Sequence, residues 1–126
     1  MRTLHSILLF VSIVLCFNAC DAIVVNQNIK KSQESANART TKIFLDSIKQ
    51  SCQMYHTIYK QYPERIEDLI HTPDGRSILD TQEPIVDKWN QPIVLEKTNN
   101  QIKLYSVGED GKANTEDDLI SILELE

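Results

Sequence analysis

Residues 93–107 decide the fold, and they read Ile-Val-Leu-Glu-Lys-Thr-Asn-Asn-Gln-Ile-Lys-Leu-Tyr-Ser-Val. From Gln101 to Val107, polar and apolar residues alternate, which is the period of a strand with one buried face. Pro92 precedes a second apolar run, Ile93 to Glu96, and the polar residues 98–100 between the two runs are typical of a turn. These residues therefore predict an antiparallel β-hairpin.

A long helix is expected on the N-terminal side of this hairpin. From Phe44 onward, apolar or aromatic residues recur in steps of three and four, at positions 44, 48, 52, 55, 58/59 and 62. This spacing gives one stripe of an amphipathic helix. Tyr62-Pro63 ends the helix, because proline cannot continue it and favours an extended conformation for the residue before it.

Shorter elements complete the predicted fold. Pro63 is well placed to begin a short helix, Glu64 to Ile70, which would bury Ile66, Leu69 and Ile70. Residues 72–75, Thr-Pro-Asp-Gly, are expected to form a turn, and Leu119 to Leu125 a third strand. The sequence thus predicts an α+β fold in which a long N-terminal helix packs on a small three-stranded antiparallel sheet.

The N-terminal segment is expected to be an export signal. Arg2 precedes an apolar run from Ile7 to Phe17, which is the arrangement of a charged n-region and an h-region. Cleavage near Ala22 is one outcome. Lipidation of Cys20, in a lipobox-like Phe-Asn-Ala-Cys sequence, is another, and a retained single span that places Asp21 in lipid is the third.

This interpretation divides the chain into three parts. Residues 1–22 form an export signal, lipoprotein signal or anchor, residues 23–35 a polar spacer, and residues 36–126 the α+β domain. Of the three cysteines, Cys16 and Cys20 lie in the first part, so Cys52 is alone in the domain and no disulfide framework is implied.

The chain is acidic, and most of its net negative charge lies in one segment. The 126 residues are 41% apolar and carry a formal net charge of -5, with no long cluster of lysine or arginine. Nucleic acid is therefore excluded as a partner, because affinity for it comes mainly from basic side chains that neutralise phosphates. Gly108 to Asp118 holds five carboxylates and one lysine, a net charge of -4.

This acidic segment joins two predicted strands and has the composition of a cation site. Hard cations such as Ca²⁺ take six to eight oxygen ligands from carboxylates and backbone carbonyls, and glycines let the backbone curl round the ion. Five like charges this close would repel one another unless they were neutralised. The EF-hand spacing is absent. The alternative is an acidic turn that simply faces water.

Several short motifs follow one another in a specific order: Arg39-Thr40 in the helix, Tyr62-Pro63 before the short helix, Asp87-Lys-Trp-Asn-Gln-Pro92 before the hairpin, and Tyr105-Ser-Val-Gly-Glu-Asp-Gly-Lys112 with Asp118-Leu-Ile120 in and after the loop. Over residues 36–121 this series resembles the periplasmic domain of the major pseudopilin of type II secretion systems. The resemblance implies a pseudopilin-like fold whose last loop binds a Ca²⁺ ion.

The resemblance also implies the ligands. Carried over by position, Asp110 and Asp118 are the expected side-chain ligands of the Ca²⁺ ion. The carbonyls of Val107 and Lys112 are the expected main-chain ligands. Asp117 and Asn114 provide further oxygens nearby.

The N-terminus departs from the family pattern. Pseudopilins begin with Gly-Phe and a Glu at the fifth mature position, and no such motif precedes the apolar run here. Two hypotheses follow. In the first, the chain is a noncatalytic, calcium-stabilised subunit for protein secretion or pilus-like assembly, with other pseudopilins, secretion machinery or itself as partners. In the second, it is a stand-alone periplasmic lipoprotein that uses the same fold to bind proteins. Both place it in the bacterial periplasm, exported or anchored in the inner membrane through its N-terminus.

No catalytic group stands out in the sequence. Cys52 and His56 lie four residues apart, a spacing that suits a thiol paired with a base or a soft metal, but a cysteine on an apolar stripe is usually a small hydrophobe. There is no GxSxG motif and no phosphate-binding loop. We expect the protein not to be an enzyme.

Overall fold

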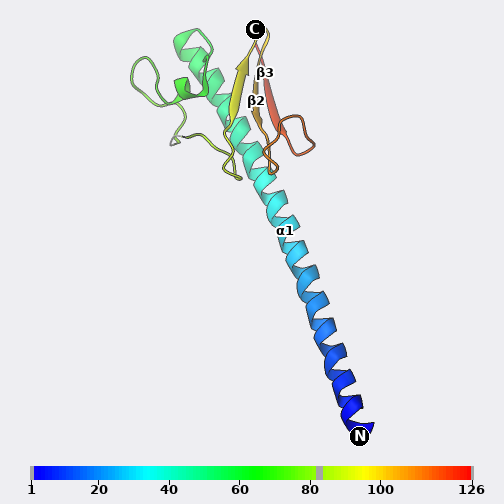
Figure 1. The fold of residues 1–126 in the computed structure, drawn as a ribbon. Coiled ribbons are helices and arrows are strands. Elements are labelled where there is room, and N and C mark those ends of the chain that lie inside the picture. Colours follow the sequence, from blue (N-terminus) through cyan, green and yellow to red (C-terminus); the bar gives the residue numbers. More distant parts are fainter. Residues whose placement is uncertain (1, 82–83, 126) are drawn as a thin grey trace. The chain divides into compact units, whose positions relative to one another are not determined.

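The computed structural model describes residues 2–81 and 84–125, with side chains from residue 24 onward. A long helix, α1 (Arg2–Tyr59), is followed by a short 3-10 helix, η1 (Ile66–Leu69), and by three strands, β1 (Val94–Lys97), β2 (Gln101–Ser106) and β3 (Leu119–Glu124) (Figure 1). The chain divides into two compact units, Met1–Ser35 and Ala36–Glu126, which are described separately below.

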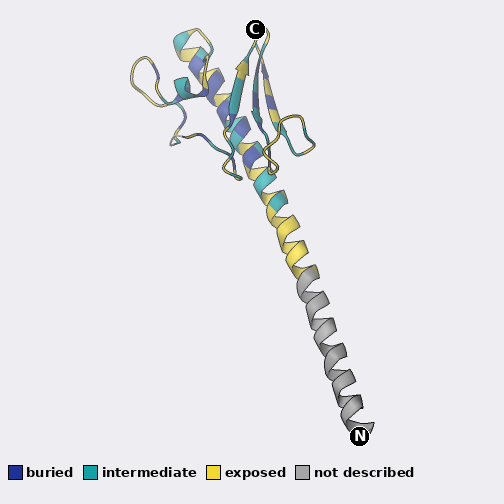
Figure 2. Cartoon of the chain, in the orientation of Figure 1, coloured by how far each residue is buried: buried dark blue, intermediate teal, exposed yellow. Residues whose placement is uncertain are grey.

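The first unit is helical. It includes the stretch predicted as a polar spacer, residues 23–35, which contains no glycine or proline to break a helix. Val24, Val25 and Ile29 are 56%, 56% and 62% exposed (Figure 2). The side chains of residues 1–22, including Cys20, lie outside the described part. In the part of the chain that the structure describes, no helix has a stretch that is both long and apolar enough to cross a membrane.

In the second unit, α1 contributes the predicted apolar stripe to the core from Phe44 to Tyr55, whereas Ile58 of that stripe is 49% exposed and Tyr62 lies beyond the helix. Leu45, Ile48 and Cys52 are fully buried (Figure 2). The helix ends at Tyr59 and not, as predicted, at Tyr62. The reason is local: Lys60 has a left-handed φ of 59°, and its amide donates to the His56 carbonyl at 2.8 Å. A residue in this conformation commonly closes a helix.

The second helix is shorter than predicted. The expected helix over Glu64 to Ile70 is a 3-10 turn over Ile66–Leu69, because the Asp68 carboxylate accepts hydrogen bonds from the amides of Glu64 (2.9 Å) and Arg65 (3.0 Å). These bonds hold the two residues just before the turn. Ile66 and Leu69 are buried as predicted, whereas Ile70 is only partly buried.

The sheet has the order β1-β2-β3 and is antiparallel throughout. The predicted hairpin is confirmed, with Val94 opposite Tyr105, and the third strand pairs Ser106 with Leu119. Alternate residues of β2 are buried, as the sequence period predicted. The α+β class is confirmed.

Polar contacts also join α1 to the edge strand β3. The Lys42 ammonium donates to the Ile120 carbonyl at 2.7 Å, and the Ser121 hydroxyl donates to the Asp46 carboxylate at 2.7 Å. This hydrogen bond, together with Lys42 and Lys49, lowers the pKa of Asp46. The contacts fix the helix against the strand that follows the acidic loop.

Candidate functional site

The acidic loop begins at a buried polar anchor. The hydroxyl of Ser106, at the end of β2, donates to the Asp87 carboxylate and accepts a hydrogen bond from the Gly108 amide at 3.1 Å. Asp87 is only 7% exposed, and it also accepts hydrogen bonds from the amides of Trp89 and Gln91, both at 2.8 Å. The loop entrance is thereby tied to the turn that precedes β1.

Glycine is required at the first position of the loop. Gly108 has a φ of +68°, and a Cβ added there would lie 2.4 Å from Asp117 Oδ2 and 2.5 Å from the Asp117 carbonyl oxygen. Asp117 therefore folds directly against the backbone of Gly108. This close approach brings the two ends of the loop together.

Four oxygens converge on the hydroxyl of Thr115. They are the Asp117 Oδ1 at 2.7 Å, the Lys112 carbonyl oxygen at 2.9 Å, the Asp118 Oδ1 at 3.3 Å and the Asp110 Oδ1 at 3.4 Å. All four are hydrogen-bond acceptors, and a hydroxyl carries a single proton. The centre of the loop thus has more negative oxygens than the one donor can satisfy.

Backbone amides hold the same carboxylates from outside. Asp110 Oδ1 accepts from the Lys112 amide at 2.8 Å, Asp117 Oδ2 from the Asp110 amide at 3.0 Å, and Asp118 Oδ2 from the Asn114 amide at 2.7 Å. The hydrogen bond from the Asp110 amide, followed by that from Thr115, lowers the pKa of Asp117. The loop therefore keeps this carboxylate charged.

The structure brings together most, but not all, of the residues that the sequence singled out. Asp110, Asp117, Asp118 and the Lys112 carbonyl all face Thr115. Asn114 takes part through its backbone amide, at a φ of +68°, and in the described residues no contact joins its side chain or the Val107 carbonyl to this group. The placement of the ion's ligands stays a prediction.

Thr115 is the residue that sequence reasoning missed. A threonine in a polar loop carries no distinguishing signal, and only the folded loop shows that three carboxylates turn toward it. Within residues 24–81 and 84–125, no group of three or more histidine, cysteine, aspartate or glutamate side chains is arranged to hold a metal ion. A cation here would depend on the backbone carbonyl as well as on carboxylates, a donor set that suits a hard ion.

The other sequence candidate, Cys52 with His56, does not form a reactive pair. Burial raises the pKa of the Cys52 thiol to about 12, so the thiolate is not available at neutral pH. His56 stacks instead on Tyr62, with ring centroids 4.1 Å apart and planes tilted by 3°. Cys52 is a core residue.

Comparisons with known proteins agree with the fold. A family model described as type II secretion system (T2SS), protein G, matches residues 28–124. The crystal structure of the major pseudopilin from the type 2 secretion system of enterohaemorrhagic Escherichia coli is similar, with a TM-score of 0.57 and 21% sequence identity. The alignment covers 72% of this chain and 87% of that chain. No curated protein matches the chain.

The structural similarity at this identity establishes the fold, and the family match, which spans well over half of the chain, establishes the family. The resemblance to major pseudopilins is confirmed. It supports the predicted role as a structural subunit of a secretion system with protein partners. The chain belongs to the protein G family of the type II secretion system.

Proposed function

We propose that this protein is a noncatalytic, calcium-stabilised structural subunit of a type II secretion system, exported to the bacterial periplasm and acting through contacts with other protein subunits. Family membership supports the structural role. The observation that carries the calcium part is the convergence of four oxygens on the single hydroxyl of Thr115.

In this proposal, the carboxylates of Asp110, Asp117 and Asp118, which are not arranged as a metal site in the described residues, close around the ion together with the carbonyl of Lys112. The Thr115 hydroxyl is the donor that satisfies part of the group when no ion is bound. A bound Ca²⁺ supplies two positive charges, which would reduce the loop's net charge from -4 to -2. Because the loop joins β2 to β3, ordering it holds together the ends of these two strands.

Thermal and chemical unfolding of the full-length protein tests the calcium site. Extracellular calcium modules bind with dissociation constants of about 10⁻⁴ to 10⁻³ M. At a Ca²⁺ concentration of about 10 mM the ion should therefore stabilise the fold by about 1.4 to 2.7 kcal/mol relative to EDTA. The double variant Asp110→Ala with Asp118→Ala should lose this gain.

Glu116→Ala is the matched control for this experiment. Glu116 is an exposed acid of the same loop that makes no hydrogen bond to the Thr115 group within the described residues. Its removal lowers the negative charge without removing a proposed ligand, so the calcium response should persist. An equal calcium response in the double variant and the wild type would overturn the site, and so would no response in the wild type.

The N-terminus separates the secretion subunit from the second hypothesis, the stand-alone lipoprotein. Mass spectrometry of the mature N-terminus, in protein isolated from bacterial membranes, shows whether Cys20 carries a diacylglyceryl group. A retained N-terminal helix together with co-purification of other pseudopilins supports the secretion subunit. A lipidated Cys20 without any pseudopilin would favour the lipoprotein instead.

A further inference from the structure

Strand β3 forms a free edge of the sheet. The order β1-β2-β3 leaves one side of β3 without a neighbouring strand among the described residues (Figure 1). Residues 119–124 contain no lysine or proline, the side chains with which proteins commonly protect an exposed edge. Ile120 and Ile122 are 42% and 46% exposed. An edge of this kind can pair with another extended chain.

The register shows which backbone groups point to this edge. In an antiparallel ladder, the N–H and C=O of one residue point to the same side, and successive residues alternate. The Thr98 amide donates to the Gln101 carbonyl at 2.8 Å across the hairpin turn, which sets the alternation for β2 and, through β2, for β3. Three residues of β3 therefore direct both backbone groups outward: Ile120, Ile122 and Glu124.

Two contacts at the ends of β3 agree with this assignment. The Leu125 amide donates to the Asn100 carbonyl at 2.8 Å, which is the inward direction expected for a residue next to Glu124. The Lys42 ammonium donates to the Ile120 carbonyl at 2.7 Å from the outer side. Within residues 24–81 and 84–125, no hydrogen bond reaches the outward N–H or C=O of Ile122 or Glu124. Water or the backbone of an added strand can satisfy these groups.

The opposite edge of the sheet, at β1, is already covered at both ends. The Ile93 amide donates to the Ile85 carbonyl at 3.1 Å, and the Lys97 ammonium donates to the Tyr62 carbonyl at 3.5 Å. Earlier segments of the chain therefore lie along β1. In the described part of the chain, the outer backbone edge of β3 has one such contact, from Lys42.

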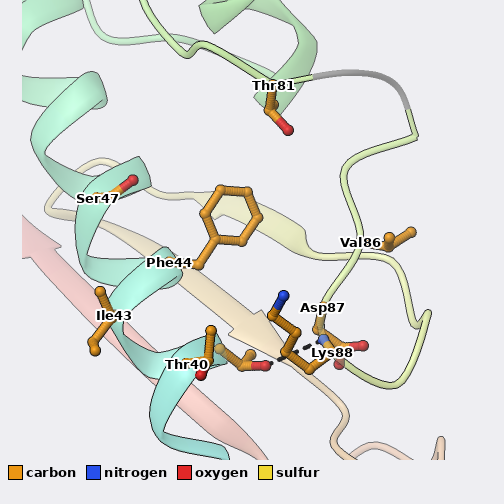
Figure 3. A pocket seen from close by; sticks show the side chains of 9 residues that line it. Thr40, Ile43, Phe44, Ser47, Thr81, Val86, Asp87 and Lys88 are labelled. Carbon is orange, nitrogen blue, oxygen red and sulfur yellow. Dashed lines mark hydrogen bonds between the residues drawn. The ribbon is translucent and has the colours of Figure 1, made fainter. Parts of the chain in front are cut away.

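Exposed apolar side chains alone do not specify what covers them. On α1, Ile43 and Phe44 border a hollow together with Val86 (Figure 3). The backbone of α1 is hydrogen-bonded within the helix, so Ile43 and Phe44 offer only their side chains to a ligand. Strand β3 differs because its outward N–H and C=O groups match an extended backbone.

The charges around the free edge favour a basic segment. The loop from Gly108 to Asp118, with a net charge of -4, leads directly into β3, and the exposed Glu124 lies at the other end of the strand. A bound Ca²⁺ would leave the loop at -2. Lys103 on the neighbouring strand does not neutralise these acids, because it is engaged by Glu96 at 3.9 Å and by the Tyr105 ring at 4.5 Å.

The same charges disfavour a second copy of β3 as the occupant. Antiparallel pairing of two β3 edges would place Glu124 of each copy beside the acidic loop of the other, and parallel pairing would place the two loops side by side. Residues 119–124 supply no basic side chain to offset this repulsion. A segment of a different protein is the better partner.

We propose that an extended, basic segment of another protein pairs with the outer edge of β3 and adds a fourth strand to the sheet. Its backbone bonds to Ile122 and Glu124, its apolar side chains at alternate positions lie beside Ile120 and Ile122, and a lysine or arginine at each end meets the acids. In strand addition of this kind, main-chain hydrogen bonds give affinity and alternate side chains give specificity. The inference rests on the proposed function, because it names the chemistry of a protein partner for a subunit that acts through protein contacts.

The test uses the full-length protein in detergent micelles and the synthetic peptide Lys-Thr-Val-Thr-Val-Thr-Lys. In the extended form, this peptide presents both valines and both lysines on one face. Amide hydrogen exchange measured by NMR should slow at least about fivefold at Ile122 and Glu124 when the peptide is bound, the equivalent of one net hydrogen bond. The same peptide with N-methylated backbone amides should give no protection, and a peptide with glutamates in place of the lysines should bind more weakly.

Two variants separate backbone pairing from charge. Ile122→Pro removes an outward N–H and leaves the bonds between β2 and β3 in place, so it should abolish peptide binding, whereas Ile122→Thr keeps the N–H and should still bind. Glu124→Lys should weaken binding of the lysine peptide and strengthen binding of the glutamate peptide. Thermal unfolding checks that each variant is folded, and Glu124→Lys decides the charge argument even if Ile122→Pro unfolds.

Equal protection by the N-methylated peptide, or no protection by the lysine peptide, would overturn the proposal. Protection of Ile122 that appears without peptide and rises with protein concentration would also overturn it, because the occupant would then be a second copy. Failure of the peptide while calcium still stabilises the wild type removes strand addition alone. Protection by the peptide without any calcium response removes the calcium site alone.

Discussion

The interface between α1 and the sheet and the loop between β2 and β3 are held together in different ways. The interface buries apolar side chains completely, among them Leu45, Ile48 and Leu104. The loop from Gly108 to Asp118 has no such core, and it is ordered by carboxylates that accept hydrogen bonds from backbone amides and from one threonine.

This difference separates two kinds of sensitivity. Apolar burial does not depend on ions or on protonation near neutral pH. A group of negative oxygens with too few donors depends on both, because a cation or a proton changes its energy directly. The calcium response of the protein should therefore arise in the loop, and the core should set the stability to which the loop adds.

The largest expected effect comes from the core. Leu104→Ala should lower the free energy of unfolding by about 2–5 kcal/mol, because Leu104 is fully buried and its truncation leaves a cavity. The gain from calcium should stay the same in this variant. Chemical unfolding with Ca²⁺ and with EDTA measures both quantities, and Ile58→Ala at an exposed site is the control. Loss of the calcium response in folded Leu104→Ala would break the separation of the two regions.

Gly108→Ala should have the next largest effect. A left-handed φ costs a residue with a side chain about 1–2 kcal/mol, and the collision of the new Cβ with Asp117 adds to this cost. The calcium response should weaken as well, since Asp117 must move. Gly75→Ala is a matched control, because Gly75 has a φ of +77° but nothing within 4 Å of an added Cβ. Equal unfolding energies for the two variants would mean that the close approach of Asp117 contributes nothing.

Thr115→Val should have a smaller effect that depends on calcium. It removes the one donor shared by the four oxygens, which should lower the free energy of unfolding by about 1 kcal/mol in EDTA. The loss should be smaller with Ca²⁺, because the bound ion neutralises the same oxygens. Thr98→Val removes a hydroxyl from the hairpin turn, where it donates to the Gln101 carbonyl at 3.1 Å. That control should cost the same with and without calcium. A Thr115→Val cost that is unchanged by calcium would contradict the proposed site.

The smallest effect is a dependence on pH. Hydrogen bonds lower the pKa of Asp117 in the folded protein, so the stability that it contributes is present above the usual aspartate pKa of about 3.9 and is lost as the pH falls through the lower folded value. Asp117→Asn should flatten this part of the unfolding curve. Asp74 acts in the same direction, since hydrogen bonds from Tyr59 and Thr72 lower its pKa to about 2. Only the difference in pH dependence between the variant and the wild type therefore reports on the loop. Identical curves would mean that the Asp117 carboxylate does not contribute to the stability.

Local patterns predicted the regular elements well. The alternation in residues 101–107 and the stripe from Phe44 to Tyr55 have periods that only a strand and a helix satisfy, and both elements are present with the expected buried faces. The ends of elements were less predictable. Whether α1 stops at Tyr59 or Tyr62 depends on the conformation of Lys60, and η1 is shortened by the Asp68 carboxylate.

The candidate site was predictable only in part. The excess of carboxylates between Gly108 and Asp118 is visible in the sequence, and the structure turns three of them inward. The position of Thr115 at their centre depends on how the loop closes through Gly108 and Asp117, and no local pattern encodes that closure. The contact of Thr41 with Lys88 joins segments that are 47 residues apart in the sequence, so it could not be read from either segment alone.

Amide hydrogen exchange with and without Ca²⁺ tests the central claim most directly, because it measures the loop and the core in one molecule. Calcium should slow exchange at the loop amides of Asp110, Lys112 and Asn114, which donate to the carboxylates of the Thr115 group. Amides of the core strand, such as that of Leu104, should change only as far as global stability changes. Slowed exchange confined to the loop is the predicted result, and a loop that exchanges equally fast in both conditions would contradict the account.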